Sequence, residues 1–227
     1  MYELYIANKN YSSWSLRPWA LMRELDIPFH EHLLPFGEPA VWTEYRKVAP
    51  GGKVPCLLDD EVVVWDSLAI AEYLAERHPG VWPADARTRA WARSAAAEMH
   101  SGFQELRQRC SMSCGVRVRL HEVPRSLGHD IARLGALWND GLERFGGPFL
   151  TGRTFNAVDA FFAPVAFRIQ TYSLILDTAS AAYARRLLEL RSLQDWYRAA
   201  LEETLRDEPH EIQIQQLGTV LSDLRQR

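Results

Sequence analysis

The chain has 227 residues, 47% of them apolar, and its 26 lysines and arginines against 29 aspartates and glutamates give a net charge of −3. This composition is typical of a packed globular protein and gives no electrostatic reason to expect a nucleic acid or an anionic membrane as partner. Because no stretch approaches the roughly 20 uninterrupted apolar residues of a membrane-spanning helix, and residues 1–10 do not resemble a secretion signal, we expect a cytoplasmic protein.

The first 78 residues alternate strand and helix patterns. Residues 2–7 alternate polar and apolar side chains as a half-buried strand does, and two apolar runs near residue 60 are spaced as a hairpin. The patterns follow the order β-α-β-α-β-β-α, with the elements at 2–7, 15–25, 29–36, 40–50, 54–58, 62–65 and from Ser67 onward. A helical crossover followed by a hairpin predicts a four-stranded mixed sheet flanked by helices.

A break at residues 77–87, RHPGVWPADAR, contains two prolines and a glycine. We therefore predict an α/β domain over 1–78, a linker over 79–86 and an all-helical domain over 87–227. In the second domain no further strand pattern stands out, and the polar tail from Pro209 is either a loose extension or a last helix. Helical spacing covers the segments 87–113, 127–145, 157–172, 181–190 and 192–206.

The cysteines are three, Cys56, Cys110 and Cys114, and no two of them form a C-x-x-C pair. This odd number argues against a disulfide framework and against a thioredoxin-type redox motif. Cys110 and Cys114 lie four residues apart on an expected helix, which favours small apolar side chains over a metal site. We therefore predict no metal centre.

Two short motifs in the first domain favour a ligand site. Pro55 precedes an apolar run and cannot donate to a strand ladder, so it marks the start or the edge of a strand. Ser67 opens a helix, where its hydroxyl and the helix N-terminus suit a carboxylate, and Asp66 beside it offers the opposite charge. Taken alone, Pro55 favours a plain turn, and plain capping by Asp66 or Ser67 is as open as a ligand contact.

These motifs lie in the stretch GGKVPCLLDDEVVVWDSLAIAEYL, residues 51–74, which resembles the glutathione-binding half of cytosolic glutathione transferases. The resemblance covers nearly the whole chain, because that family continues from a thioredoxin-like domain into an all-helical one. It implies a cis bond before Pro55, backbone pairing of Val54 with the peptide ligand, and contacts of Asp66 and Ser67 with the γ-glutamyl end. It also places Lys53 near the glycine carboxylate, although a solvated lysine is the alternative.

The stretch SSWSLRPWAL, residues 12–21, resembles the Ser-Ser-Cys-x-x-Arg signature of the zeta class. A free thiol is roughly 3% thiolate at pH 7, and a hydroxyl hydrogen bond at a helix N-terminus is of the order needed to make the thiolate dominant. Alignment on the arginine gives Ser12 the catalytic place, with Ser13 as its neighbour and Tyr11 as a competing hydroxyl. Because proline fits the first helical turn best, Pro18 predicts that Ser15 caps the helix.

The second-substrate site is implied by the resemblance alone. That family places it between the serine loop and the fourth helix, although such a row of side chains is also typical of plain helix packing. Zeta isomerases hold a substrate carboxylate with an arginine seven residues after the proline of the sixth helix; here that position is Thr171, and Arg168 is the substitute. The candidates are Trp14, which replaces the motif cysteine, and Met99, His100, Phe103, Arg107 and Arg168.

The first functional hypothesis is a glutathione transferase in which a serine activates the glutathione thiol to attack a small electrophile. Alternatives are a glutathione-dependent isomerase, weakened by Trp14 and Thr171, a peroxidase, or a non-catalytic glutathione-binding or interaction protein. A thiol-disulfide oxidoreductase needs a cysteine where Ser12 stands. The resemblance also implies a homodimer. In the second domain, Asn156 and Asp159 have the spacing of a capping box, which predicts a structural role for Asp159.

Overall fold

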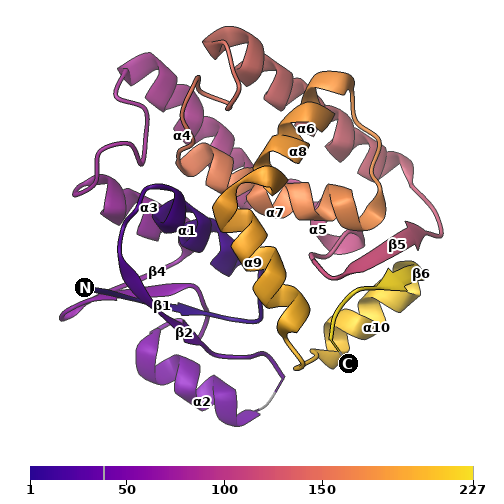
Figure 1. The fold of residues 1–227 in the computed structure, drawn as a ribbon, viewed down its shortest axis with the longest axis horizontal. Coiled ribbons are helices and arrows are strands. Elements are labelled where there is room, and N and C mark those ends of the chain that lie inside the picture. The colour runs from indigo at the N-terminus through magenta and orange to yellow at the C-terminus, as the bar shows by residue number, and fades with distance from the viewer. Residues whose placement is uncertain (38, 227) are drawn as a thin grey trace.

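A computed structural model describes residues 1–37 and 39–226 (Figure 1). Its first part has the predicted order of strands and helices. The elements are β1 (Tyr2–Ile6), α1 (Ser13–Glu24), β2 (Phe29–Leu33), α2 (Pro39–Val48), β3 (Cys56–Asp59), β4 (Val62–Trp65) and α3 (Ser67–Ala75). Figure 1 shows α2 on the side of the sheet that faces away from the helical part, and α1 and α3 on the side that faces it.

The sheet has the strand order β2-β1-β3-β4. β1 pairs in parallel with β2 and antiparallel with β3, and β3 forms the predicted hairpin with β4. Leu4 and Ile6 of β1 are fully buried, so the central strand carries the alternation that the sequence predicts. The thioredoxin-like fold class is therefore confirmed.

The second part contains α4 (Ala86–Ser101), α5 (Gln104–Arg109), β5 (Val116–Leu120), α6 (Arg125–Phe145), α7 (Ala157–Tyr172), α8 (Thr178–Glu189), α9 (Arg191–Glu202), α10 (Glu208–Leu217) and β6 (Gly218–Asp223). The helix expected over 87–113 is broken at Phe103, whose φ of 56° is left-handed. The tail beyond Pro209 forms a helix and then a strand. Within the described residues, no helix combines the length and the apolar character needed to cross a membrane.

The second part is helical as predicted, but the expectation that it holds no strand was wrong, because β5 and β6 form a two-stranded antiparallel sheet. β5 has the sequence VRVRL, in which buried Val116 and Val118 alternate with the more exposed Arg117 and Arg119. This period-two pattern is short, and its partner lies about a hundred residues later in the chain. Neither strand is recognisable without the other.

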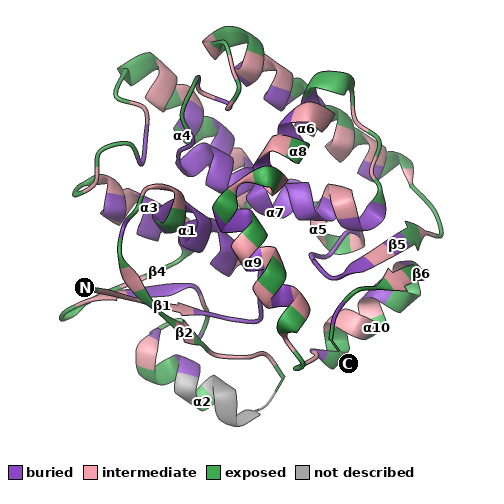
Figure 2. Ribbon diagram, in the orientation of Figure 1, coloured by how far each residue is buried: buried purple, intermediate pink, exposed green. Residues whose placement is uncertain are grey.

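α7 is the centre of the helical part and is buried over most of its length (Figure 2). It packs against α1, α4 and α8, and its contact with α1 joins the sheet to the helices. The predicted capping box at its start is confirmed: the Asn156 side chain accepts from Val158 N–H, and the Asp159 carboxylate accepts from Asn156 N–H. Asp159 also accepts from Leu150 N–H at 3.1 Å and from the Tyr183 hydroxyl at 2.8 Å.

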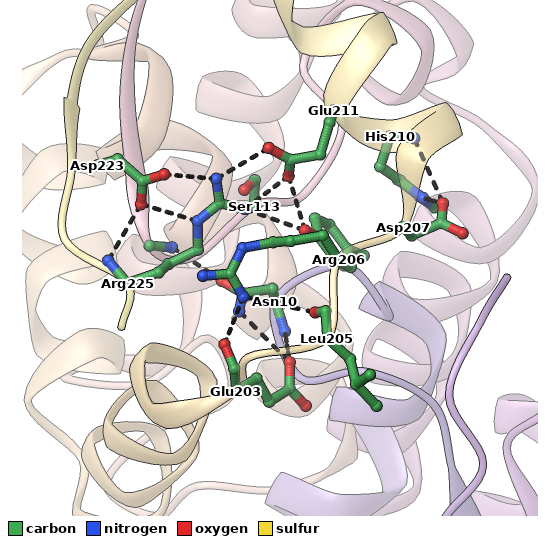
Figure 3. A network of polar contacts seen from close by, with 12 residues as sticks. Asn10, Ser113, Glu203, Leu205, Arg206, Asp207, His210, Glu211, Asp223 and Arg225 are labelled. Carbon is green, nitrogen blue, oxygen red and sulfur yellow. Dashed lines mark hydrogen bonds and ion pairs between the residues drawn. The ribbon is translucent and has the colours of Figure 1, made fainter. Parts of the chain in front are cut away.

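The segment after α9 returns to the start of the chain and is held there by charged side chains (Figure 3). Arg225 is buried and pairs with both Glu211 and Asp223. At the end of α9, Glu203 accepts hydrogen bonds from the backbone N–H groups of Lys9 and Asn10. These bonds place α10 beside the loop between β1 and α1.

Candidate active site

The loop that ends β1 turns into α1 at Ser12, which is the N-cap of the helix. Its Oγ accepts from Ser15 N–H at 3.4 Å, and its carbonyl accepts from Leu16 N–H at 3.2 Å. The expectation that Ser15 caps this helix was therefore wrong. Pro18 lies inside the helix rather than in its first turn. It has no N–H to donate to the Trp14 carbonyl, but the hydrogen bond from Leu16 to Ser12 lies closer to the N-terminus and is unaffected.

The three serines of this loop have different hydrogen-bond partners. The Ser12 hydroxyl donates to Ser15 Oγ at 2.7 Å, and Ser15 Oγ also accepts from Ala7 N–H at 3.2 Å. Both the donor and an acceptor site of Ser12 are thus used inside the loop. Among the residues that the structure describes, no partner is found for the Ser13 hydroxyl, which lines a cavity. Ser13 is therefore the serine whose hydroxyl is available to a ligand.

Tyr11, the competing hydroxyl, is occupied. Its O–H donates to Glu211 Oε1 at 2.6 Å and accepts from Arg225 at 3.0 Å. Burial and the hydrogen bond to Glu211 raise the pKa of Tyr11 well above its usual range. Its hydroxyl is committed to the C-terminal segment and is not presented to the cavity as a donor.

A cavity of about 540 Å³ brings together all five predicted glutathione contacts. It lies at the edge where β3, β4 and α3 begin or end, next to the start of α1. The Val54–Pro55 bond is cis, as the resemblance implies. The cavity is lined by Trp14, Gly51, Lys53, Val54, Pro55, Trp65, Asp66 and Ser67.

Asp66 and Ser67 are held in the geometry of a helix cap. Asp66 has a φ of 76°, which is unusual for a residue with a side chain, and its Oδ1 accepts from Leu68 N–H at 2.8 Å. Its other oxygen lies 3.5 Å from His100 Nε2 and its side chain is 45% exposed, so it can meet a ligand cation. The buried Ser67 hydroxyl accepts from Arg17 at 3.2 Å, which leaves its own hydrogen for a ligand acceptor.

A second cavity of about 460 Å³ adjoins the first, since both are lined by Trp14, Lys53 and Val54. Ser12 and Ser13 of the loop before α1 and His210 and Gln213 of α10 all line it. Of the predicted second-substrate residues, Trp14, Arg107 and Arg168 line it. The remaining lining residues are Tyr11, Phe36, Tyr45, Gly52, Ser111, Met112, His210 and Gln213.

The other three second-substrate candidates do not line either cavity. Met99 is buried and offers its backbone carbonyl to Arg107. His100 packs edge-on against Trp14 with ring centroids 5.2 Å apart, and burial lowers its pKa. Phe103 is the buried left-handed residue that precedes α5 as its N-cap. These three residues therefore pack behind the site and do not line it.

Arginines concentrate positive charge at the second cavity. Arg107 and Arg168 line it, and Arg17 lies behind Trp14 with its guanidinium 4.2 Å from the ring centroid. None of the three forms an ion pair with a carboxylate of residues 1–37 or 39–226; their polar contacts are to carbonyls, a serine and a histidine. Burial lowers the pKa of all three, that of Arg107 to about 10.

Several lining residues could not be expected from the sequence. His210 and Gln213 come from α10, a segment whose pattern left loop and helix open. Phe36 precedes α2 and Tyr45 lies within it, and that helix has no motif of its own. The cysteines lie outside the cavities and are buried; burial raises the pKa of Cys56 to about 11 and of Cys110 to about 12, so both thiols are protonated near neutral pH.

Comparison with known proteins finds similarity to one family. A family model described as the N-terminal domain of glutathione S-transferase matches residues 11–77. Over 128 residues, 53% of the chain, it is 34% identical to a zeta-class glutathione S-transferase of Euphorbia esula, matching 55% of that protein. Over 105 residues, 45% of the chain, it is 34% identical to a probable maleylacetoacetate isomerase of Caenorhabditis elegans, matching 48% of it. The chain thus spans about half the length of these curated relatives.

Solved structures share the fold along almost the full length. A glutathione transferase homologue from Burkholderia GL BGR1, with bound glutathione, is 21% identical with a TM-score of 0.65, over 88% of this chain and 97% of that one. Isozyme E7 of glutathione S-transferase from Drosophila melanogaster is 19% identical with a TM-score of 0.66, over 98% and 100% of the two chains. At these identities the similarity concerns the fold alone.

Proposed function

We propose that this chain, which belongs to the glutathione S-transferase family, binds glutathione and activates its thiol for attack on a small electrophile. One observation carries the proposal. The five predicted glutathione contacts line one cavity, Ser13, whose hydroxyl has no partner among the described residues, lines the next, and the two cavities share Trp14, Lys53 and Val54.

Glutathione occupies the first cavity in this proposal. The backbone of Val54 pairs with the peptide, Lys53 attracts the glycine carboxylate, and the γ-glutamyl end meets Asp66 and Ser67. Ser67 suits the carboxylate because Arg17 already donates to its oxygen, so the hydroxyl hydrogen is directed elsewhere. Asp66 suits the ammonium because one of its oxygens is free of the helix cap.

The thiol then lies where the two cavities meet, at the N-terminus of α1. Lowering the pKa of a thiol by two units takes about 2.7 kcal/mol of selective stabilisation of the thiolate. A hydroxyl hydrogen bond from Ser13 and the helix dipole together supply that order of energy. Ser12 has an indirect role, because its hydrogen bond to Ser15 holds the loop in place. The thiolate forms a bond to the electrophilic carbon, and the leaving group departs with the electron pair.

The electrophile in this proposal carries an acidic group. Arg107 and Arg168 face the second cavity without a carboxylate partner in the described part of the chain, and a bound carboxylate would compensate their charge. This observation also favours isomerisation of an unsaturated acid as the second candidate function. Thr171, at the position of the expected isomerase arginine, is buried and donates to the Ser113 carbonyl at 2.7 Å, whereas Arg168 lines the cavity.

Glutathione binding tests the first step, by isothermal calorimetry. Wild-type protein is expected to bind glutathione, and Asp66→Asn to bind about tenfold more weakly, since a charge-assisted contact is lost. Asparagine also caps helices and tolerates a positive φ, so the fold stays intact. Glu61→Gln, exposed at the nearby hairpin tip, is the matched control. Absence of binding to the wild type at millimolar glutathione would refute both the transferase and the isomerase.

The acidic-electrophile proposal is tested with a matched pair of substrates, chloroacetate and chloroacetamide. Replacing Arg168 with methionine is expected to raise KM for chloroacetate about tenfold and to leave KM for chloroacetamide within twofold, because only the carboxylate needs the charge. Arg168→Lys keeps a charge and should lose less. An equal loss for both substrates would assign Arg168 to packing instead.

The homodimer and the cytoplasmic location stay predictions. For the dimer, the support is an edge strand, β4, that exposes apolar side chains; Val62 is 45% and Trp65 47% exposed. Trp65 also lines the glutathione cavity, so a partner subunit at this edge would cover that end of the site.

A further inference from the structure

His210 is a titratable residue of the second cavity that the proposed function leaves unused. It lies in the first turn of α10 and lines the cavity together with Ser13. Its imidazole is stacked between Tyr11, with centroids 5.0 Å apart, and Phe36, with centroids 5.6 Å apart. Because Tyr11 directly precedes Ser12, the stack fixes the imidazole against the loop that presents the Ser13 hydroxyl.

A buried carboxylate orients this imidazole. His210 Nδ1 is hydrogen-bonded to Asp207 Oδ2, and the same oxygen accepts from the backbone N–H of His210 at 3.3 Å as the cap of α10 (Figure 3). The Asp207 residue is 5% exposed. A carboxylate at Nδ1 keeps the proton of the neutral ring on that nitrogen, so Nε2 carries a lone pair. Nε2 has no partner among the described residues.

We infer that His210 is the proton acceptor for the glutathione thiol, with Asp207 as its positioning residue; this inference rests on the proposed function. The S–H bond breaks, its proton moves to Nε2, and the electron pair stays on sulfur. The sulfur then forms its bond to carbon as the leaving group departs. The imidazolium returns the proton to the leaving group or to water. Ser13 cannot take this role, because a hydroxyl stabilises the thiolate by donating and does not accept its proton.

The charges around His210 are consistent with this role. On its own helix Asp207 favours the imidazolium, while Glu211 is occupied by Tyr11 and Arg225. From the other elements, Lys53, Arg107 and Arg168 line the same cavity and disfavour a lasting positive charge on the ring. The imidazole is thus stabilised when it takes up a proton and is also able to release it.

The test measures kcat/KM for glutathione and 1-chloro-2,4-dinitrobenzene as a function of pH, beside glutathione affinity. His210→Phe keeps the aromatic stack and removes both nitrogens; we expect kcat/KM at pH 7 to fall about tenfold, with glutathione affinity within twofold of wild type. The loss should shrink as the pH rises, because hydroxide then removes the proton. His129→Phe, at an exposed position of α6, is the matched control and should behave as wild type.

A second variant keeps the inference testable if the first does not fold. His210→Ala opens space for free imidazole, which is expected to restore part of the turnover in that variant and none in the wild type. Asp207→Asn retains the helix cap and should lower kcat/KM severalfold with a shifted pH profile. Unchanged pH profiles in a wild type that binds glutathione and turns it over would overturn the inference alone. Failure of the wild type to bind glutathione would instead overturn the proposed function.

Discussion

Replacement of Ser13 by alanine is expected to lower kcat/KM for glutathione and 1-chloro-2,4-dinitrobenzene at pH 7 by roughly 10- to 100-fold. A hydrogen bond to a charged group is worth about 1.5–3 kcal/mol, and the Ser13 hydroxyl has no other described partner to compensate its loss. The thiolate absorbance of bound glutathione should titrate at higher pH in the variant, while glutathione affinity stays within twofold of wild type. Stopped-flow kinetics and a spectroscopic pH titration measure both.

Ser12→Ala is the matched comparison, because the two serines are neighbours with different partners. Its hydroxyl donates to Ser15 and caps α1, so its loss is expected to lower the melting temperature by a few degrees, since a cap contributes about 1 kcal/mol. The pH at which the bound thiol titrates should change less than in Ser13→Ala. A larger pKa shift of the bound thiol in Ser12→Ala than in Ser13→Ala would assign the thiolate contact to Ser12.

Asp159→Ala is expected to reduce the free energy of unfolding by about 3–5 kcal/mol. The substitution removes the acceptor of two backbone N–H groups and of the Tyr183 hydroxyl, and an unsatisfied buried polar group costs about 1–3 kcal/mol. For a chain of this size the melting temperature should fall by roughly 10 °C. Calorimetry or circular dichroism would measure the loss, and urea titration its free energy.

Tyr183→Phe separates the parts of this network. It removes one donor and leaves the Asp159 carboxylate with its two backbone partners. The decrease in the free energy of unfolding should therefore be well below that of Asp159→Ala. Glutathione affinity of both variants, measured well below their melting temperatures, is expected to equal that of wild type. A ligand-binding defect with normal thermal stability in Asp159→Ala would contradict the structural role.

The sheet part was predictable because its signals are local. The alternation in β1, the turn between β3 and β4 and the cap at Asp66 each lie within a few residues, and the bonds they imply are the ones found. β5 and β6 were not predictable on the same grounds. The pairing of Val118 with Val220 supplies the partner that turns a short alternating run into a strand.

The candidate site divides in the same way. Residues 53–55 and 66–67 follow one another along the chain, so the motif that predicts them also brings them into one cavity. The choice between Ser12 and Ser13 depended on where α1 begins, and the argument from Pro18 placed its N-cap at Ser15, three residues later than Ser12. His210 and Asp207 had no motif at all, because the return of the chain after α9 is what brings His210 against Tyr11 at this cavity.

The hydrogen bonds that fix the loop between β1 and α1 also affect when the site forms during folding. Lys9 and Asn10 are bound by Glu203, and Tyr11 by Glu211 and Arg225, partners that lie between 193 and 214 positions away in the sequence. Contacts between residues so far apart in the sequence form only after large loops have closed, whereas β1 and α1 follow one another in the sequence. A refolding chain should therefore regain its helical signal before it regains a closed cavity, and intermediates in between would expose the apolar walls of that cavity.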